Sequence, residues 1–191
     1  MFGDDIAAYL PEHIRPFKKL LKDFPENYEK WVHSTSVPNE LYQGDVLDSA
    51  IIVNVDGQGE IERAEIPVMV ISCTCDVQPG QGETLLIAAV YDFEDYKKNH
   101  SLTDFELEDH LRALQRNEIA NLFYLPSGQK LKASVVDFQL ISPVSLNYFY
   151  PDRFRNRLTS LSQVGHYFFL MKLAHHMARP ESKDAERGQP Q

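Results

Sequence analysis

Cysteine and tryptophan are scarce in this chain, which contains two cysteines and one tryptophan among 191 residues. The cysteines, Cys73 and Cys75, are separated by one residue on a predicted strand, where such neighbours point to opposite faces. A disulfide between them is geometrically poor, which argues against a disulfide-stabilised secreted domain. Two reduced thiols in a cytoplasmic protein are therefore expected.

Long apolar runs are also missing. None approaches the roughly 18 consecutive apolar residues that a membrane span requires, so no membrane association is expected. Residues 1–5 do not provide the basic start of a secretory signal. With 43% apolar and 25% charged residues, the composition is typical of a globular protein that buries a core.

Positive charge is in deficit, since the net charge is −9, and this argues against nonspecific coating of nucleic acid. The deficit is uneven: residues 41–121 hold 16 acidic against 5 basic residues, whereas residues 122–180 hold 2 against 7. Such a division can mark a binding face, or the two halves can neutralise each other in the folded chain. The basic residues that stand out are Lys130, Lys132, Arg153, Arg155 and Arg157.

The chain divides into three parts by composition. Residues 1–38 are predicted to be an N-terminal helical appendage, because apolar residues recur at helical spacing up to a polar linker. Residues 41–178 alternate strand-like and helical segments and are expected to form the main domain. The polar residues 180–191 are expected to form a disordered tail.

The strands of the main domain are predicted from short apolar runs bounded by turn residues. The turn at 56–59 joins two strands in a hairpin, and a capping box at Thr103 and Glu106 begins an inserted helix. Ser160 and Gln163 form a second capping box before a C-terminal helix. The predicted strands are 46–55, 60–65, 68–73, 84–91, 122–125, 131–140 and 141–146. These elements indicate an α+β domain with a small, strongly bent antiparallel sheet or barrel.

The order of five segments resembles the PemK/MazF group of toxins, whose fold is a small SH3-like barrel. In that group a Gly-Asp strand start precedes a buried strand with a core proline, and an arginine element precedes the closing helix. The matching segments here are Gly44-Asp45-Val46, Ile66 to Ser72, Leu85 to Val90, Val135-Val136-Asp137 and Arg157 to Ser162. The resemblance covers residues 41–178 and implies a bacterial toxin–antitoxin or phage-defence setting. The resemblance also leaves open whether this chain forms a homodimer.

Two positions depart from what the resemblance implies for a ribonuclease. The toxins carry an arginine before the core proline, where this chain has Ile66, and a Thr or Ser in the next strand, where it has Ala88-Ala89-Val90. RNA cleavage needs a base, an acid and cations for the phosphate, and these apolar side chains supply none. A non-catalytic or divergent module that binds protein or RNA is therefore the leading prediction. A divergent endoribonuclease is the alternative.

The segment Ser72 to Asp76 is the most unusual polar stretch, and it resembles a Ser-x-Thr-Cys-Asp signature of uncharacterised bacterial proteins with the same barrel. Ser72, Cys75 and Asp76 form a candidate polar site, with Cys75 as a nucleophile or ligand. Alternatively, Cys73 packs in the core and Asp76 caps a turn. Zinc sites usually combine two Cys/His pairs and Cys-x-Cys lacks the second, so no metal or other cofactor is predicted. A cysteine-based redox or metal sensor is a third hypothesis, which predicts either bound zinc or a thiol with a depressed pKa at Cys75.

The basic cluster Arg153, Arg155 and Arg157 follows the aromatic residues 148–150. Arginine and aromatic side chains can hold single-stranded RNA, and arginine also pairs with carboxylates of a protein partner. The same arginines can instead pair with acidic residues of this chain. Binding is predicted at these arginines and at Lys130 and Lys132, with a protein partner favoured over RNA.

Overall fold

The computed structural model describes residues 28–34, 40–77, 82–99, 102–128, 130–149 and 156–177. The predicted helices before residue 28, Arg153, Arg155 and the tail 180–191 lie outside these ranges. The strands are β1 (Val46–Val55), β2 (Ile61–Val70), β3 (Thr84–Asp92), β4 (Leu122–Leu125), β5 (Ser134–Ser145) and β6 (Arg157–Thr159). The helices are α3 (Tyr28–Trp31), α4 (Phe93–Lys98), α5 (Asp104–Gln115), α6 (Gln163–Met177) and the 3-10 helix η2 (Leu146–Tyr148).

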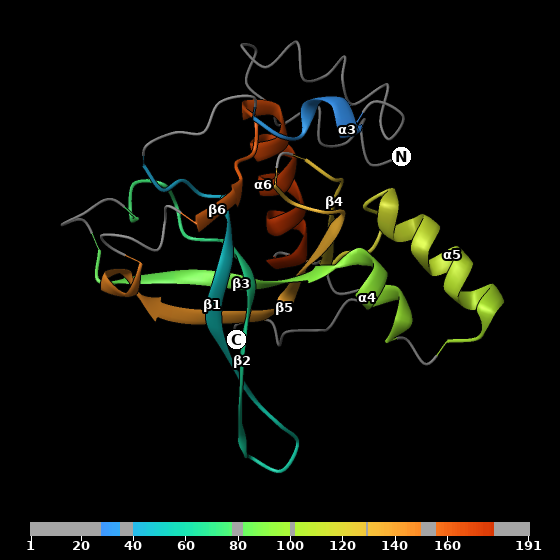
Figure 1. The fold of residues 1–191 in the computed structure, drawn as a ribbon, viewed down its shortest axis with the longest axis horizontal. Coiled ribbons are helices and arrows are strands. Elements are labelled where there is room, and N and C mark those ends of the chain that lie inside the picture. Colours follow the sequence, from blue (N-terminus) through green and yellow to red (C-terminus); the bar gives the residue numbers. More distant parts are fainter. Residues whose placement is uncertain are drawn as a thin grey trace, which may run out of the picture.

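Within these ranges, one six-stranded sheet has the strand order β4-β5-β3-β2-β1-β6, and each neighbouring pair is antiparallel. The predicted α+β class is confirmed. Figure 1 shows the β1–β2 hairpin extending away from the rest of the sheet. The turn of this hairpin is the predicted one. Asp56 accepts hydrogen bonds from Gln58 N and Glu60 N, both at 2.8 Å, and Gly59 has a positive φ of 87°.

Two strands run through segments that the sequence predicts as separate strands. β2 covers both 60–65 and the start of 68–73, and β5 covers most of 131–146. The register shifts twice: between Leu47 and Ala50 in β1, and opposite Ala88/Ala89 of β3, where β5 has the extra residues 138–140. Such irregularities bend a strand. Ser142 of β5 then contacts β1, where its Oγ accepts from Val53 N and donates to Val53 O, both at 3.0 Å. The sheet is therefore curved so strongly that β5 contacts β1, although these strands are not neighbours in the strand order.

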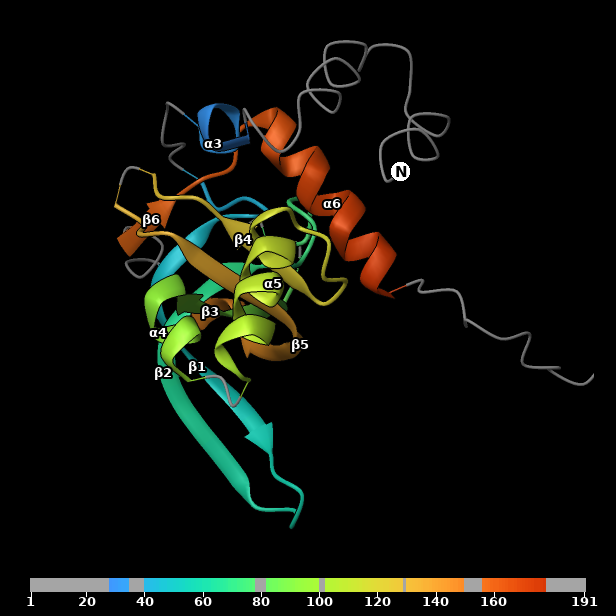
Figure 2. The same cartoon turned by 90° about the vertical axis from the view of Figure 1, so that its right-hand side faces the viewer.

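Both faces of the central strands are buried, which explains their uninterrupted apolar runs. On β3, Ala88 and Val90 face one apolar cluster and Ile87 and Ala89 face another. α6 covers the first cluster through Phe168 and Phe169, and Tyr28 of α3 packs on Phe168 with ring centroids 5.3 Å apart. Figure 2 shows α6 lying along this side of the sheet. The second cluster lies inside the curl of the sheet.

Helices α5 and α6 each begin at a capping residue, and the sequence predicted the cap of α5 correctly. Thr103 and Glu106 form the predicted capping box of α5, with Glu106 Oε2 3.1 Å from Thr103 N. The predicted cap of α6, Ser160, is wrong, because α6 begins only at Gln163 and Ser160 directly follows β6. Ser162 takes its place, since its Oγ accepts from Gly165 N at 2.9 Å.

Candidate functional site

A hollow of about 430 Å³ opens between β2, the end of β3 and α4, and we name it the Pro67 pocket. Its lining residues are Ile66, Pro67, Val90, Tyr91, Asp92, Asp95, Tyr96 and Asn99. Among these described lining residues, two are acidic and none is basic. The pocket therefore combines apolar and aromatic surface with negative charge.

Pro67 explains why the pocket opens at this point. β2 pairs with β3 from Val68 to Val70, so the ladder stops next to Pro67. Proline has no N–H with which to continue such a ladder, and β2 separates from β3 there. On the other side, β3 ends at Asp92, whose Oδ1 accepts from Glu94 N at 2.9 Å and begins α4. The sequence analysis did not predict α4, which forms one wall of the pocket.

Two tyrosines line the pocket in their protonated form at neutral pH. Burial raises the pKa of Tyr91 and of Tyr96, and the Asp137 carboxylate raises both further. The Tyr96 hydroxyl lies 2.9 Å from His110 Nε2, and the two rings stack with centroids 6.0 Å apart. Side chains from α5 and β5 therefore surround the tyrosine of α4 and fix its position.

The two carboxylates of the pocket have lysine neighbours on their outer side. Lys98 Nζ lies 3.0 Å from Asp95 Oδ1, and Lys132 Nζ lies 3.6 Å from Asp92 Oδ2. The lysine side chains are largely exposed, at 69% for Lys98 and 86% for Lys132, so these pairs contribute little stability. A second hollow of about 200 Å³ is lined by both lysines and shares Asp92 and Asp95 with the Pro67 pocket.

Arg157, a predicted binding residue, lies inside the protein in an ion pair that we name the Asp45–Arg157 junction. Its Nε lies 3.0 Å from Asp45 Oδ2, and the two side chains are 2% and 1% exposed. Arg157 also donates to Ser160 Oγ at 3.4 Å and to Glu40 O, while Asp45 accepts from Tyr42 N at 2.8 Å. Burial raises the pKa of Asp45 to about 6, although Arg157 opposes the rise.

The remaining predicted basic residues lie elsewhere. Lys132 is beside the Pro67 pocket, and Lys130 is exposed. Arg153 and Arg155 lie outside the described residues, so the structure brings together no cluster of the basic residues that it describes. Arg157 and Lys132 both pair with carboxylates of the acidic half, at Asp45 and Asp92. These two pairs agree with the interpretation that the two halves of the chain neutralise each other.

The segment Ser72 to Asp76 forms a turn rather than the end of a strand. β2 ends at Val70, and Asp76 N donates to Cys73 O at 2.9 Å. Both predictions for the cysteines are wrong for this reason: they do not point to opposite faces of a strand, and Cys73 is not in the core. Cys73 and Cys75 are exposed, and their Sγ atoms lie 2.9 Å apart.

Asp76 lies next to this thiol pair, with its Oδ1 3.7 Å from Cys75 Sγ. The hydrogen bond with Cys73 raises the pKa of Cys75, and burial and the Asp76 carboxylate raise it further. The hypothesis of a depressed pKa at Cys75 is therefore contradicted. Cys75 is a protonated thiol at neutral pH, which is a poor nucleophile.

Gln43 connects the turn to α6, a contact that the sequence analysis missed. Gln43 Nε2 donates to Ile71 O at 2.7 Å, which directs Gln43 Oε1 toward His166 Nε2 at 3.2 Å. Gln43 N also donates to Thr74 Oγ1 at 3.2 Å. Burial lowers the pKa of His166, so its ring is neutral at neutral pH. Gln43 and His166 are 123 positions apart, and no local motif marks such a pair.

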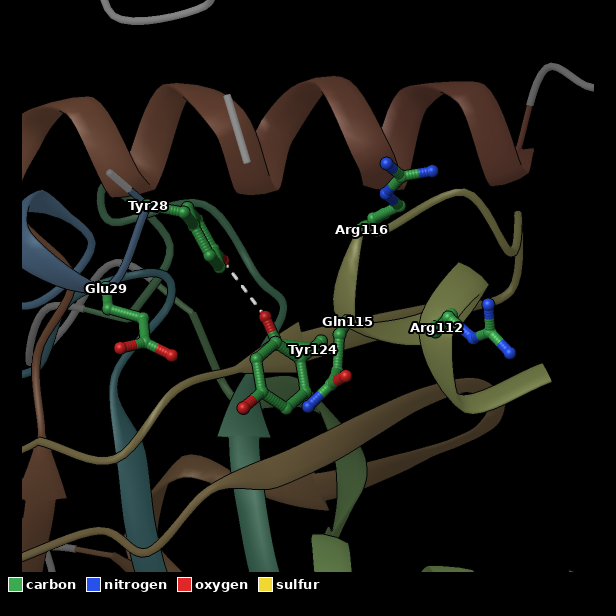
Figure 3. Close-up of a pocket in the computed structure, with 6 residues that line it drawn as sticks. All are labelled: Tyr28, Glu29, Arg112, Gln115, Arg116 and Tyr124. Atoms are coloured by element: carbon green, nitrogen blue, oxygen red, sulfur yellow. Dashed lines mark hydrogen bonds between the residues drawn. The ribbon is translucent and has the colours of Figure 1, made fainter. Parts of the chain in front are cut away.

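A third hollow, of about 290 Å³, lies between α3, α5 and β4 (Figure 3). Its lining residues are Tyr28, Glu29, Arg112, Gln115, Arg116 and Tyr124. Tyr28 fixes one wall by donating to Tyr124 O at 3.0 Å. Figure 3 shows Arg112 pointing away from Tyr124, and Arg112 Nη2 lies 3.5 Å from Glu108 on the same helix. The lining of this hollow contains both acidic and basic side chains, and these side chains do not point toward a common centre.

In comparisons with known proteins, the chain matches no protein-family model and no curated protein sequence. Among the described residues, no helix has both the length and the apolar content that a membrane crossing needs. The function is therefore inferred from the pocket, the junction and the turn themselves.

Proposed function

We propose that this chain is a non-catalytic PemK/MazF-like module that binds a basic segment of a partner protein in the Pro67 pocket. The observation that carries the proposal is the lining of this pocket, where Asp92 and Asp95 lie beside Tyr91 and Tyr96 and no lining residue that the structure describes is basic. The PemK/MazF resemblance implies a toxin–antitoxin or phage-defence setting, which is part of the proposal.

Two contacts support a PemK/MazF-like barrel. Asp45 and Arg157 belong to the first and the last of the five resembling segments, and they meet in the buried junction. Ser142 brings β5 back to β1, which is the approach that closing a small barrel requires.

The position of the pocket favours binding over catalysis. It lies at Ile66 and Pro67, where the resembled toxins place a catalytic arginine, and here the side chain before the proline is apolar. Ala88 and Ala89 of the neighbouring strand are fully buried and carry no functional group. An RNA phosphate would meet Asp92 and Asp95 without a compensating cation from the lining, so the electrostatic energy opposes RNA in this pocket.

A lysine or arginine side chain of a partner matches the same surface. Its charge can lie over the face of Tyr91 or Tyr96, an interaction worth about 0.5–1 kcal/mol at an exposed site. Asp92 and Asp95 can accept its hydrogen bonds, after displacing the exposed Lys132 and Lys98. Because the attraction is between exposed charges, the affinity should fall as salt rises.

The experiment compares a labelled lysine- and arginine-rich peptide with a labelled single-stranded RNA by fluorescence polarisation over a salt series. We expect the peptide to bind and the RNA to remain unbound and uncleaved. Asp95→Asn should weaken peptide binding by about fivefold to tenfold, which is roughly one lost charge-assisted contact. Asp109→Asn is the matched control, since it removes an exposed carboxylate of α5 outside the pocket.

Two results would contradict the proposal. Equal peptide affinity in the wild type and in Asp95→Asn would show that the peptide does not bind in the Pro67 pocket. Cleavage of the RNA that persists with a metal chelator would instead support the divergent endoribonuclease. Urea unfolding of each variant checks that the change in binding is not a change in folding.

A further inference from the structure

Three metal-ligating side chains lie together on the turn that follows β2, at the opposite end of the β2–β3 ladder from the Pro67 pocket. We name Cys73, Cys75 and Asp76 the dithiol turn. Their donor atoms all lie within 4.8 Å of one another, and all three residues are exposed. Two sulfur donors and one carboxylate donor from four consecutive residues therefore face solvent at one point.

Ser72, which precedes the donors, and Thr74, which lies between the two cysteines, attach the turn to the body of the protein. Ser72 Oγ accepts from Leu86 N of β3 at 2.8 Å, and Thr74 Oγ1 accepts from Gln43 N at 3.2 Å. Gly82 also packs closely against the turn, because a Cβ at this position would lie 2.7 Å from Asp76 O. Ser72 and Thr74 thus hold the backbone of the turn while the two thiols and the carboxylate project outward.

We propose that the dithiol turn binds one thiophilic divalent cation, with zinc as the model ion, through the two thiolates and the Asp76 carboxylate. Binding forms two metal–sulfur bonds and one metal–oxygen bond, and the two thiol protons are released to solvent. Three protein ligands leave a fourth tetrahedral position for a water molecule or for a donor from another protein. This site is separate from the Pro67 pocket and does not depend on the proposed function.

The geometry needs only a small adjustment to accept the ion. With zinc–sulfur bonds of about 2.3 Å, the two sulfurs of a tetrahedral site lie about 3.8 Å apart. The Sγ atoms here lie 2.9 Å apart, so they must separate by somewhat less than about 1 Å, and both side chains are exposed and unobstructed by the core.

The carboxylate distinguishes a metal site from a redox pair. A disulfide-forming pair uses the two sulfurs alone, and a neighbouring negative charge disfavours the thiolate that must attack. A bound cation, in contrast, gains a third ligand from Asp76 and stabilises both thiolates. The spacing Cys-x-Cys-Asp on an anchored turn therefore suits a cation better than thiol–disulfide exchange.

The test is a titration of the full chain with Co²⁺ under reducing conditions, followed by the thiolate-to-cobalt charge-transfer absorption and then by competition with zinc. We expect one ion per chain. Cys73→Ser and Cys75→Ser should each abolish the charge-transfer band expected of a dithiolate site, and Asp76→Asn should weaken binding about tenfold. Asp109→Asn, an exposed carboxylate on α5, should bind like the wild type.

The exposure of all three residues keeps the variants interpretable, because neither serine substitution removes a core contact. Urea unfolding without metal should give the same midpoint for the wild type and for the three variants. Absence of the charge-transfer band in the wild type, or its persistence in both serine variants, would overturn the site. The metal site would also be overturned if the chain binds no cobalt and a small disulfide oxidant converts the two thiols into a disulfide. The two cysteines would then be a redox pair.

Discussion

The Asp45–Arg157 junction and the Pro67 pocket both hold charged side chains, yet they differ in chemistry and in burial. At the junction, a carboxylate and a guanidinium pair inside the protein with side-chain exposures of 1% and 2%. At the pocket, apolar side chains such as Ile66 lie beside two carboxylates, two phenols and the amide of Asn99 around an open hollow. The paired charges of the junction hold strands together, whereas the carboxylates of the pocket lie where a ligand can reach them.

This comparison predicts the largest effect for Arg157→Ala. The substitution leaves Asp45 buried without its cation, so the free energy of unfolding should fall by about 3–5 kcal/mol. Urea unfolding measures the change. Arg112→Ala is the matched control, because its side chain is 67% exposed, and it should shift the same quantity by no more than about 0.5 kcal/mol. An Arg157→Ala protein as stable as this control would show that the junction is not structural.

A second prediction concerns pH at the junction. Because burial raises the pKa of Asp45 from 3.8 to about 6, the native state holds this proton more tightly than the unfolded state. The stability contributed by this proton is complete below about pH 4 and is lost as pH rises through about 6. The wild type should lose on the order of 1–3 kcal/mol relative to Asp45→Asn over this interval.

Urea unfolding of both proteins at several pH values between 4 and 7 tests this sign. A wild type that instead gains stability over Asp45→Asn as pH rises would mean that the attraction of Arg157 outweighs burial and lowers the pKa of Asp45.

A third prediction tests the pocket by adding a positive charge to its lining. Ile66→Arg places a positive charge beside Asp92 and Asp95, so the affinity for a basic peptide should fall by about tenfold, or roughly 1.4 kcal/mol. RNA should remain uncleaved, because Ala88 and Ala89 still supply no acid or base. Ile66→Met controls for packing at the same position and should keep most of the binding. Cleavage of RNA by Ile66→Arg would show that one residue separates this pocket from a nuclease.

The smallest effect is expected at Lys132. Its side chain is 86% exposed and lies 3.6 Å from Asp92, so Lys132→Ala should change the free energy of unfolding by about 0.5 kcal/mol or less. Since the substitution releases Asp92, a basic peptide should bind slightly more tightly, by up to about twofold. A measurable loss of RNA binding in this variant would instead assign Lys132 to a nucleic-acid surface.

The local elements of the fold were predictable from the sequence, because their signals lie within a few residues. The hairpin turn at 56–59 and the capping box of Thr103 and Glu106 show this. The sequence did not predict β6, with three residues, or α4, with six, because neither is long enough to show a periodic pattern. The cap of α6 was misplaced by two residues, because Ser160 with Gln163 fits the capping-box pattern, whereas the actual cap, Ser162, has Gly165 rather than Glu or Gln three residues later.

The candidate sites were less predictable, because they depend on contacts between distant segments. The sequence marked Arg157 as cationic, but only the fold pairs it with Asp45. The sequence marked Ser72, Cys75 and Asp76 as unusual, but only the turn places Cys73 beside Cys75. The sequence did not mark Asp92 and Asp95 at all, because only the fold brings them together with Pro67 in one pocket.

The junction also has a consequence for the order in which the chain acquires its structure. The hydrogen bond from Arg157 to Glu40 O spans 117 positions, whereas only residues 56–60 separate the paired Val55 and Ile61 of the β1–β2 hairpin. Closure of the longer loop costs more entropy, so the central hairpin can form well before β6 pairs with β1. During synthesis, Asp45 would lie next to an unpaired strand edge until the last fifth of the chain emerges. A protein truncated before Arg157 should therefore be a target for chaperones and proteases.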